Sequence, residues 1–259
     1  MQPKIERLKQ VVSILRERNG AAIKDLAGSL GVSEMTIRRD LERLRLDNII
    51  FLVHGAAIYN SSSSSNGPDA DYHVAIEEAV SNPEKERIGK AAARMVSPGD
   101  TIIIDIGTTT EMLAKHLPQN CPITVLCFTM NVLADVHRKN VENLILGGGY
   151  YHASTQLFES AEAVSLIRRI RATKLFLSAA GVNRDMGLTT VNQYEVHIKQ
   201  ACIESSLQKI LLVDSKKFGH VRPAYVAPLN TVDAVITDTG ISPAWVRVLE
   251  EMGITVQAV

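Results

Sequence analysis

The sequence has few cysteines, few aromatic residues and no excess of either charge. Cys121, Cys127 and Cys202 are odd in number and form no C-x-x-C pair, so we expect neither disulfides nor a bound metal. The first ten residues include charged side chains, unlike a signal peptide, and no apolar run approaches the roughly 18 residues that span a bilayer. These absences predict a cytoplasmic protein without a cofactor or a membrane partner.

Length and charge together predict two domains of unequal size. A chain of 259 residues is longer than a typical domain of about 100 to 200 residues. Hydrophobic residues make up 46% and charged residues 22%, which is typical of a globular protein and not of a disordered one. The net charge of zero hides an asymmetry, because residues 1–58 hold ten Lys and Arg against seven Asp and Glu. A small basic domain on a mildly acidic body fits a phosphate-contacting head joined to a sensor.

The amino-terminal segment carries three helical patterns. Apolar residues spaced by three and four predict helices over 5–18, 24–30 and 34–47. Gly31 marks the turn before the third helix, and Ser33 is its expected N-cap. Three short helices in fewer than fifty residues predict a compact unit.

A hairpin and a linker are predicted after these helices. Two β-prone runs, 49–53 and 56–58, flank the turn at His54-Gly55 and indicate a small wing. The serine-rich segment that follows has the composition of a flexible linker, which we place at 59–71. The small domain is therefore expected over 1–58 and the large one over 72–259.

The third helix carries the sharpest functional signal. Ile37, Leu41 and Leu44 fall within about 60° of one another on a helix and should face the core. The two adjacent arginines then point outward, and in a helix-turn-helix the first turn of such a helix meets base edges. A solvated basic face is the alternative for an isolated Arg-Arg pair, but the order of elements favours DNA binding. The expected DNA contacts are Ser33, Glu34, Met35, Thr36, Arg38, Arg39, Arg43 and His54.

The rest of the chain alternates helical patterns with short, almost wholly apolar runs. This order predicts an α/β domain with a mostly parallel sheet covered on both faces. The predicted strands are 101–106, 123–127, 143–146, 174–178, 209–213, 234–237 and 255–258.

Polar or glycine-rich corners follow several of these strands. The phrase DIGTTT joins a strand to a helix, where free backbone N–H groups, the helix dipole and hydroxyl groups suit a phosphate monoester; an ordinary threonine-capped helix is the alternative. Lys217 supplies a positive charge, and Asp105 or Asp214 is suited to accept hydrogen bonds from sugar hydroxyls. Because parallel strands share a carboxyl edge, we expect one cleft there. Its expected residues are Asp105, Gly107, Thr108, Thr109, Thr110, Gly147, Gly148, Ser178, Gly181, Asp214 and Lys217.

Three further residues near these corners are weaker candidates. Asn131 begins another helix and is as well suited to an N-cap as to a ligand contact. His152 and Lys216 are expected at the surface.

Several motifs resemble the DeoR family of bacterial sugar-metabolism repressors. GVSEMTIRRDL and VHGAA are similar to its amino-terminal signature, and DIGTTT, GGG, SAAGV and DSKKFG extend the resemblance over nearly the whole chain. The wing departs from the family pattern, which more often has glycine, arginine and glycine where this chain has Asn48, Leu52 and Ala56. A phosphate contact from the wing is therefore expected to be missing.

The resemblance implies a function as well as a fold. It implies that the large domain resembles ribose-5-phosphate isomerase and binds a phosphorylated sugar without converting it. Those enzymes carry an acidic DGADE loop, whereas Ser178–Gly181 has no acid, so we expect no enzymatic activity. Loops such as CFTMN, YYHAS and KKFGHVRPA look most like family members of pentose metabolism, which favours a pentose phosphate.

The sequence thus predicts a repressor that binds operator DNA and is relieved by a phosphorylated sugar. Palindromic operators call for a homo-oligomer. Two alternatives stay open: a sugar-phosphate isomerase or lyase with an accessory DNA-binding head, and a nucleoid-type DNA binder without an effector.

Overall fold

The structure of the chain, a computed structural model, describes residues 4–18, 20–46, 50–53, 55–59 and 83–259. Internal contacts divide the chain into two units, Met1–Ser81 and Asn82–Val259. The predicted linker lies outside the described residues except for Tyr59, which ends a strand. No helix in the described ranges is long and apolar enough to cross a membrane.

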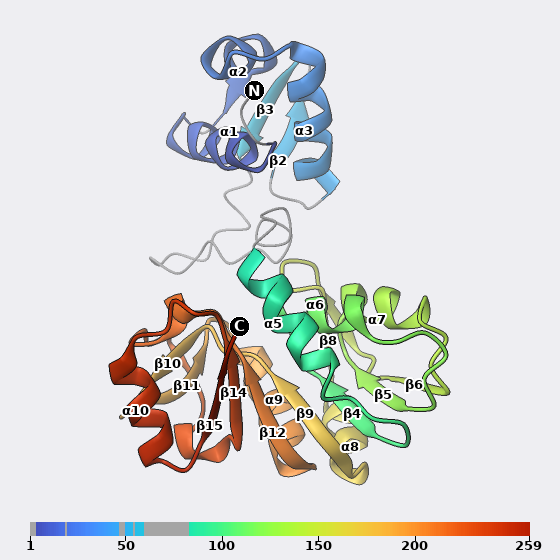
Figure 1. Cartoon of the computed structure of the whole chain (residues 1–259). Coiled ribbons are helices and arrows are strands. Elements are labelled where there is room, and N and C mark those ends of the chain that lie inside the picture. Colours follow the sequence, from blue (N-terminus) through green and yellow to red (C-terminus); the bar gives the residue numbers. More distant parts are fainter. Residues whose placement is uncertain (1–3, 19, 47–49, 54, 60–82) are drawn as a thin grey trace. The chain divides into compact units, whose positions relative to one another are not determined.

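The described part of the amino-terminal unit holds three helices and a three-stranded antiparallel sheet (Figure 1). Its elements are α1 (Lys4–Arg18), β1 (Ala21–Ala22), α2 (Ile23–Leu30), α3 (Glu34–Leu46), β2 (Ile50–Val53) and β3 (Ala56–Tyr59). The helices and the hairpin agree with the prediction to within a residue or two. The strand β1 was not predicted: its two residues pair with β3, so the sheet order is β1-β3-β2.

Local chemistry explains how α3 is placed in this unit. Gly31 ends α2 in the left-handed conformation, with φ of 64°, which costs glycine least. The Ser33 hydroxyl then accepts a hydrogen bond from the Thr36 backbone N–H at 3.2 Å, as expected of an N-cap. Ile37, Leu41 and Leu44 are all buried, which confirms the predicted inward face of α3.

The larger unit is built on a seven-stranded sheet in which every neighbouring pair is parallel (Figure 1). The strand order is β15-β14-β12-β9-β4-β5-β6. The strands are β4 (Thr101–Ile104), β5 (Thr124–Cys127), β6 (Asn143–Leu146), β9 (Ala172–Leu177), β12 (Ser206–Leu212), β14 (Ala234–Thr237) and β15 (Thr255–Ala258). All seven predicted strands are present, and the predicted parallel α/β fold is confirmed.

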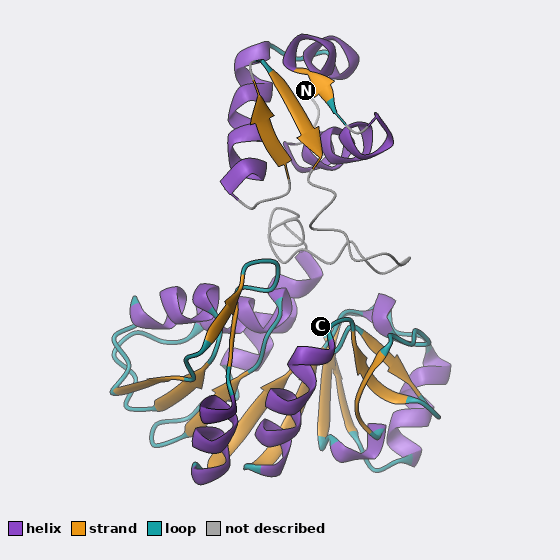
Figure 2. Cartoon of the chain, turned by 180° about the vertical axis from the view of Figure 1, so that it is seen from behind, coloured by secondary structure: helices purple, strands orange, loops and turns teal. Residues whose placement is uncertain are grey.

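Helices cover both faces of this sheet, which Figures 1 and 2 show from opposite sides. Alternate strand residues point to opposite faces, so Ile102 and Ile104 enter one core and Ile103 the other. The first core includes residues of α5 (Pro83–Ala93), α6 (Thr108–His116) and α7 (Met130–His137), and the second those of α8 (Ala161–Arg169), α9 (Val196–Glu204) and α10 (Pro243–Glu251).

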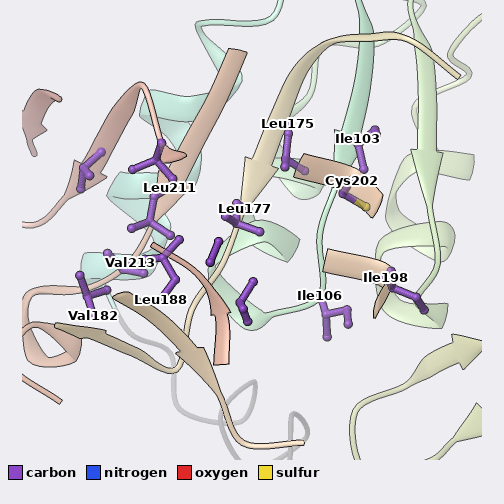
Figure 3. Close-up of a cluster of buried hydrophobic side chains, with 14 of the residues drawn as sticks. Ile103, Ile106, Leu175, Leu177, Val182, Leu188, Ile198, Cys202, Leu211 and Val213 are labelled. Carbon is purple, nitrogen blue, oxygen red and sulfur yellow. The ribbon is translucent and has the colours of Figure 1, made fainter. Parts of the chain in front are cut away.

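Short strands and turns that the sequence did not predict complete the unit. A small antiparallel sheet packs Val182 and Leu188 against Leu211 of β12 and Val213, which follows that strand (Figure 3). The additional elements are β7 (Tyr150–His152), β8 (Leu157–Glu159), β10 (Gly181–Asn183), β11 (Gly187–Thr190), β13 (Ala224–Ala227), η2 (Gln193–Glu195), η3 (Ser215–Lys217) and η4 (Leu229–Thr231).

The strand order reverses between β4 and β9. From β4 the chain moves outward to β5 and β6, then returns to place β9 on the other side of β4 and continues through β12, β14 and β15. In open α/β sheets, the carboxyl ends of the strands at such a switch point are where ligands bind. Here those ends lead into Asp105 and Ser178.

Candidate functional site

The predicted DNA-contacting side chains lie mostly on the surface of the helix-turn-helix unit. Thr36 is half-buried, and His54 lies outside the described residues. The exposed members are Ser33, Glu34, Met35, Arg38, Arg39 and Arg43. The structure therefore places these residues on one short segment, at the start and along the outer face of α3.

Charge on this face is only partly neutralised within the protein. Arg38 lies 3.6 Å from Glu34, one turn earlier in α3. Arg39 and Arg43 have no ion-pair partner among the described residues, so both guanidinium groups are available to phosphate or a base. The hydroxyls of Ser33 and Thr36 are 2.9 Å apart and bond to each other.

A buried ion pair fixes α3 to α1. The Arg7 Nε donates to Asp40 Oδ2 at 2.6 Å, and Nη2 lies 3.4 Å from Oδ1, with both side chains buried. No sequence pattern predicted this pair, although Asp40 directly precedes the inward-facing Leu41. The pair holds the exposed arginine face of α3 in one orientation.

At the switch point of the larger unit, Asp105, Gly107 and Ser178 meet. Asp105 Oδ2 accepts the Ser178 backbone N–H at 2.8 Å, and the Ser178 hydroxyl lies 3.1 Å from the same oxygen and also bonds the Ile106 carbonyl. Gly107 has φ of 147°, and a Cβ atom there would lie 3.0 Å from Ser178 Oγ. Only glycine fits this approach without strain.

Lys199 joins this corner from α9, a contact that the sequence analysis missed. Its ammonium lies 2.5 Å from Asp105 Oδ2 and 3.1 Å from both the carbonyl and the hydroxyl oxygens of Ser178. The exposed fractions of the two charged side chains are 1% for Lys199 and 0% for Asp105. Their sequence neighbours Ile106 and Ile198 belong to the hydrophobic core (Figure 3).

A second buried carboxyl group, that of Glu195, lies close to the same cluster. It accepts hydrogen bonds from the Thr190 hydroxyl at 2.5 Å and the Asn192 amide at 2.7 Å. Burial raises its pKa above the ordinary value, while Lys199 acts in the opposite direction. Ser178–Gly181 has no acid of its own, as the sequence indicated, but Asp105 at the neighbouring strand end contacts Ser178 directly.

The spacing of Glu195 and Lys199 is a signal that the sequence carries. Residues four apart share one face of a helix, and Ile198 and Cys202 lie on that face too. All four are buried. Charged residues that share a helix face with apolar residues are expected to be buried and not solvated.

The threonines of DIGTTT are enclosed in the structure. The Thr110 hydroxyl lies 2.7 Å from the Asp105 carbonyl and 2.8 Å from the Gly107 carbonyl, so it closes the loop onto itself. Thr108 and Thr109 are buried in the first turn of α6. Asn131 donates to Glu111 of this helix at 3.1 Å. Its expected N-cap role is wrong, because Thr129 occupies that position in α7.

The other two predicted glycine corners, at Gly147–Gly148 and at Gly181, lie where the chain packs closely against neighbouring segments. The Gly148 carbonyl accepts from the Ser160 hydroxyl at 2.8 Å, and a Cβ on Gly147 would lie 3.4 Å from that of Ala163. Gly181 has no room for a side chain, since a Cβ would lie 2.6 Å from the His220 carbonyl oxygen.

The last predicted corner follows β12. Asp214 is buried, and its Oδ1 accepts the Lys216 backbone N–H at 3.1 Å, whereas Lys217 is half-buried without an ion pair in the described part of the chain. Lys216 is exposed as expected. His152 is not a simple surface residue: it stacks on Tyr194 with ring centroids 3.8 Å apart and lies 2.8 Å from Glu159.

The corners lie on one edge of the sheet, where Asp105 itself is fully buried. A surface pocket of about 490 Å³ instead runs along α8 to the start of α9, with Arg168, Arg169 and His197 among its lining residues. None of the predicted effector residues lines it. Among the described residues there is no group of three metal-ligating side chains.

Comparison with known families agrees with both units. The DeoR-like helix-turn-helix domain matches residues 7–63, and the DeoR C terminal sensor domain matches residues 81–239. The chain belongs to the DeoR family. It is therefore a DNA-binding transcription regulator with a sensor domain, and this family is not a family of enzymes.

Full-length relatives cover almost the whole of this DeoR-family protein. It is 32% identical to the transcriptional regulator YulB of Bacillus subtilis, over 98% of this chain and 96% of the relative. It is 32% identical to the deoxyribose operon repressor of Escherichia coli K12 and 31% identical to the glycerol-3-phosphate regulon repressor of the same strain, over 90% of each chain. A ribose 5-phosphate isomerase structure from Methanocaldococcus jannaschii covers 52% of the chain, with a TM-score of 0.37.

Removing one member of the Arg7–Asp40 pair should destabilise the DNA-binding unit. Asp40→Ala leaves a buried guanidinium without its partner, which costs about 3 to 5 kcal/mol. Hydrogen exchange of α1 and α3 amides, followed by mass spectrometry, measures this loss. The double variant Arg7→Met, Asp40→Leu removes both charges and should recover most of the protection; equal loss in both variants would contradict the pair's role.

Glu195→Gln should change how stability depends on pH. Because the pKa of Glu195 is raised in the folded state, its stabilising contribution is present at low pH and is lost as pH rises through that pKa. The thermal midpoint of the variant relative to the wild type, followed by Trp245 fluorescence, should therefore rise as the pH increases above the ordinary glutamate pKa of about 4.3. Glu204→Gln, at an exposed position on α9, is the control and should show no such gain.

Proposed function

We propose that this protein represses a sugar or nucleoside catabolic operon and releases its operator when a phosphorylated sugar binds the larger unit. The observation that carries the proposal is the meeting of Asp105, Gly107 and Ser178 at the switch point, in one chain with a helix-turn-helix. Relatives named as repressors of a deoxyribose operon and a glycerol-3-phosphate regulon support it. Such a protein acts in the cytoplasm.

On the DNA side, the proposal uses the exposed face of α3. Residues at the start of the helix face base edges in the major groove, and the free guanidinium groups of Arg39 and Arg43 neutralise phosphate or contact guanine. Leu52, exposed in the wing, has no charge for a phosphate contact. The affinity for operator DNA therefore depends chiefly on α3.

On the effector side, the proposal places a phosphoryl group near the backbone of Gly107 to Thr109 and the ammonium of Lys217. Backbone N–H groups at a helix N-terminus and an unpaired lysine both stabilise an anion. Gly147, Gly148, Gly181 and Asp214 border the site on neighbouring corners. Because Asp105 is fully buried in the structure, contact with a ligand requires side chains around it to move.

Regulation requires two states of the protein that differ in affinity for the effector. An effector weakens DNA binding only if it binds the DNA-free arrangement more tightly than the DNA-bound one. A two-fold symmetric operator would pair with a homo-oligomer, which places two α3 helices on successive half-sites.

Arg39→Ala should weaken operator binding. If Arg39 neutralises phosphate, the loss is uniform across sequences and the salt slope falls by about one; if it contacts a base, about 1 to 3 kcal/mol is lost at one operator position. Fluorescence anisotropy at several salt concentrations measures both effects. Arg45→Ala is the matched control, because Glu42 already holds Arg45 at 2.6 Å. Equal operator binding by the Arg39 variant and wild type would remove Arg39 from the interface.

A sugar phosphate should release operator DNA, and its unphosphorylated parent sugar should not. The reason is that the proposed site stabilises the phosphoryl group through charge and backbone N–H groups. A gel-shift titration with pentose, hexose and triose phosphates measures the release. Retention of the operator with every phosphorylated sugar would count against the proposed function.

A further inference from the structure

Two aspartate–lysine pairs lie at opposite ends of the junction between β4 and β9. At the amino end, Lys174 Nζ lies 2.5 Å from Asp100 Oδ2, and at the carboxyl end, Lys199 Nζ lies 2.5 Å from Asp105 Oδ2. Both carboxylates are buried. Because each end has a buried aspartate paired with a lysine, the hydrogen-bond donors to the carboxylate oxygens of Asp100 and Asp105 can be compared directly.

At the amino end every carboxylate oxygen has a donor. Asp100 Oδ2 accepts from the Ser97 backbone N–H at 2.7 Å as well as from Lys174, and Oδ1 accepts from the Thr173 hydroxyl at 2.8 Å. This saturation is the usual condition of a buried carboxylate, since an unsatisfied buried acceptor is costly. The Asp100 site therefore needs nothing from outside the protein.

At the carboxyl end one oxygen is left over. All three nearby donors, the Ser178 N–H, the Ser178 hydroxyl and Lys199, lie within hydrogen-bond distance of Asp105 Oδ2, whereas the buried Oδ1 has no hydrogen-bond partner. In the described ranges no other buried carboxylate oxygen lacks a donor. The unsatisfied acceptor thus lies at the end of the junction where α/β sheets bind ligands, beside the half-buried Ser178.

We propose that Asp105 Oδ1 accepts a hydrogen bond from a hydroxyl group of the effector, and that Lys199 is a positioning residue that holds the other oxygen. This inference rests on the proposed function. A carboxylate repels a phosphoryl group, and Lys199 already balances its charge, so a neutral donor is the complementary group. The effector is then a phosphate ester that carries a free hydroxyl, bound with its anionic end away from Asp105.

Hydroxyl recognition by a charged acceptor predicts strong discrimination. A hydrogen bond to a charged group that is lost on substitution lowers affinity by about ten- to hundredfold. A site built to bond a hydroxyl rejects the analogue that lacks it, because the site's polar group is then unpaired. Lys199 matters to this discrimination only through Asp105.

The test compares ligands with and without hydroxyl groups on the full-length chain. The probes are ribose 5-phosphate, 2-deoxyribose 5-phosphate, glucose 6-phosphate, glycerol 3-phosphate and propyl phosphate, which has no hydroxyl group, with affinity measured by calorimetry. Asp105→Asn should weaken the hydroxylated probe that binds the wild type by about ten- to hundredfold and propyl phosphate by less than about threefold. The matched control Asp100→Asn should weaken neither selectively.

Two further measurements separate positioning and folding from recognition. Lys199→Met should reduce the hydroxyl-dependent difference in affinity, and Lys199→Arg should restore part of it, a pattern that loss of stability alone does not produce. In the wild type, which needs no variant to fold, at least one monodeoxy analogue of the binding probe should lose about tenfold or more in affinity.

The outcomes distinguish the inference from the function on which it rests. If no phosphorylated probe binds the wild type, the proposed function and the inference both fail. If probes bind the wild type and Asp105→Asn equally, or if propyl phosphate is weakened as much as the hydroxylated probe, only the inference fails, and Oδ1 then bonds no more than an internal water.

Discussion

The buried contact between the Lys199 ammonium and the Asp105 carboxylate determines how the larger unit is organised at its switch point. Removing two ions from water is expensive, and their attraction offsets the cost only when geometry and additional hydrogen bonds are good. Ser178 supplies those bonds through its backbone N–H, its carbonyl and its hydroxyl. The ends of β4 and β9 and the middle of α9 are therefore held together by charge and not by apolar packing alone.

A pair of this kind is weak evidence for stability, since apolar residues of similar volume often serve as well. Its position is more informative, because it lies where two central strands diverge and leaves an acceptor unsatisfied. The smaller unit uses the same device, with Arg7 and Asp40 joining α1 to the helix that carries the exposed arginines. In both units, a buried ion pair orients the element that the proposed function needs.

The fold was largely predictable because its signals are local. The central strands of the main sheet are buried on both faces and read as apolar runs, as Ile102–Ile104 does, whereas the edge strands β6 and β15 are partly exposed; short apolar runs revealed all seven. The short strands β7, β8, β10 and β11 were missed. They hold three or four residues each and include glycines and polar residues, so no period is long enough to recognise.

The site was predictable only where it depends on strand ends. Asp105, Gly107 and Ser178 were found because parallel strands bring their carboxyl ends to one edge. Lys199 and Glu195 were missed because tertiary packing, which no linear pattern states, carries α9 to that edge. A charged residue on a helix is usually solvated. The only sign that Lys199 is buried was its place on the same helix face as the apolar residues Ile198 and Cys202.

Asp100 and Asp105, at the junction of β4 and β9, also restrict motion. Sliding one strand past the other by a single residue is a displacement of about 3.3 Å, enough to break the Lys174–Asp100 contact at one end and the Ser178–Asp105 hydrogen bond at the other. The centre of the sheet therefore behaves as a rigid base. A shape change that accompanies binding has to occur in the loops and helices that leave this base, and the strands themselves keep their alignment.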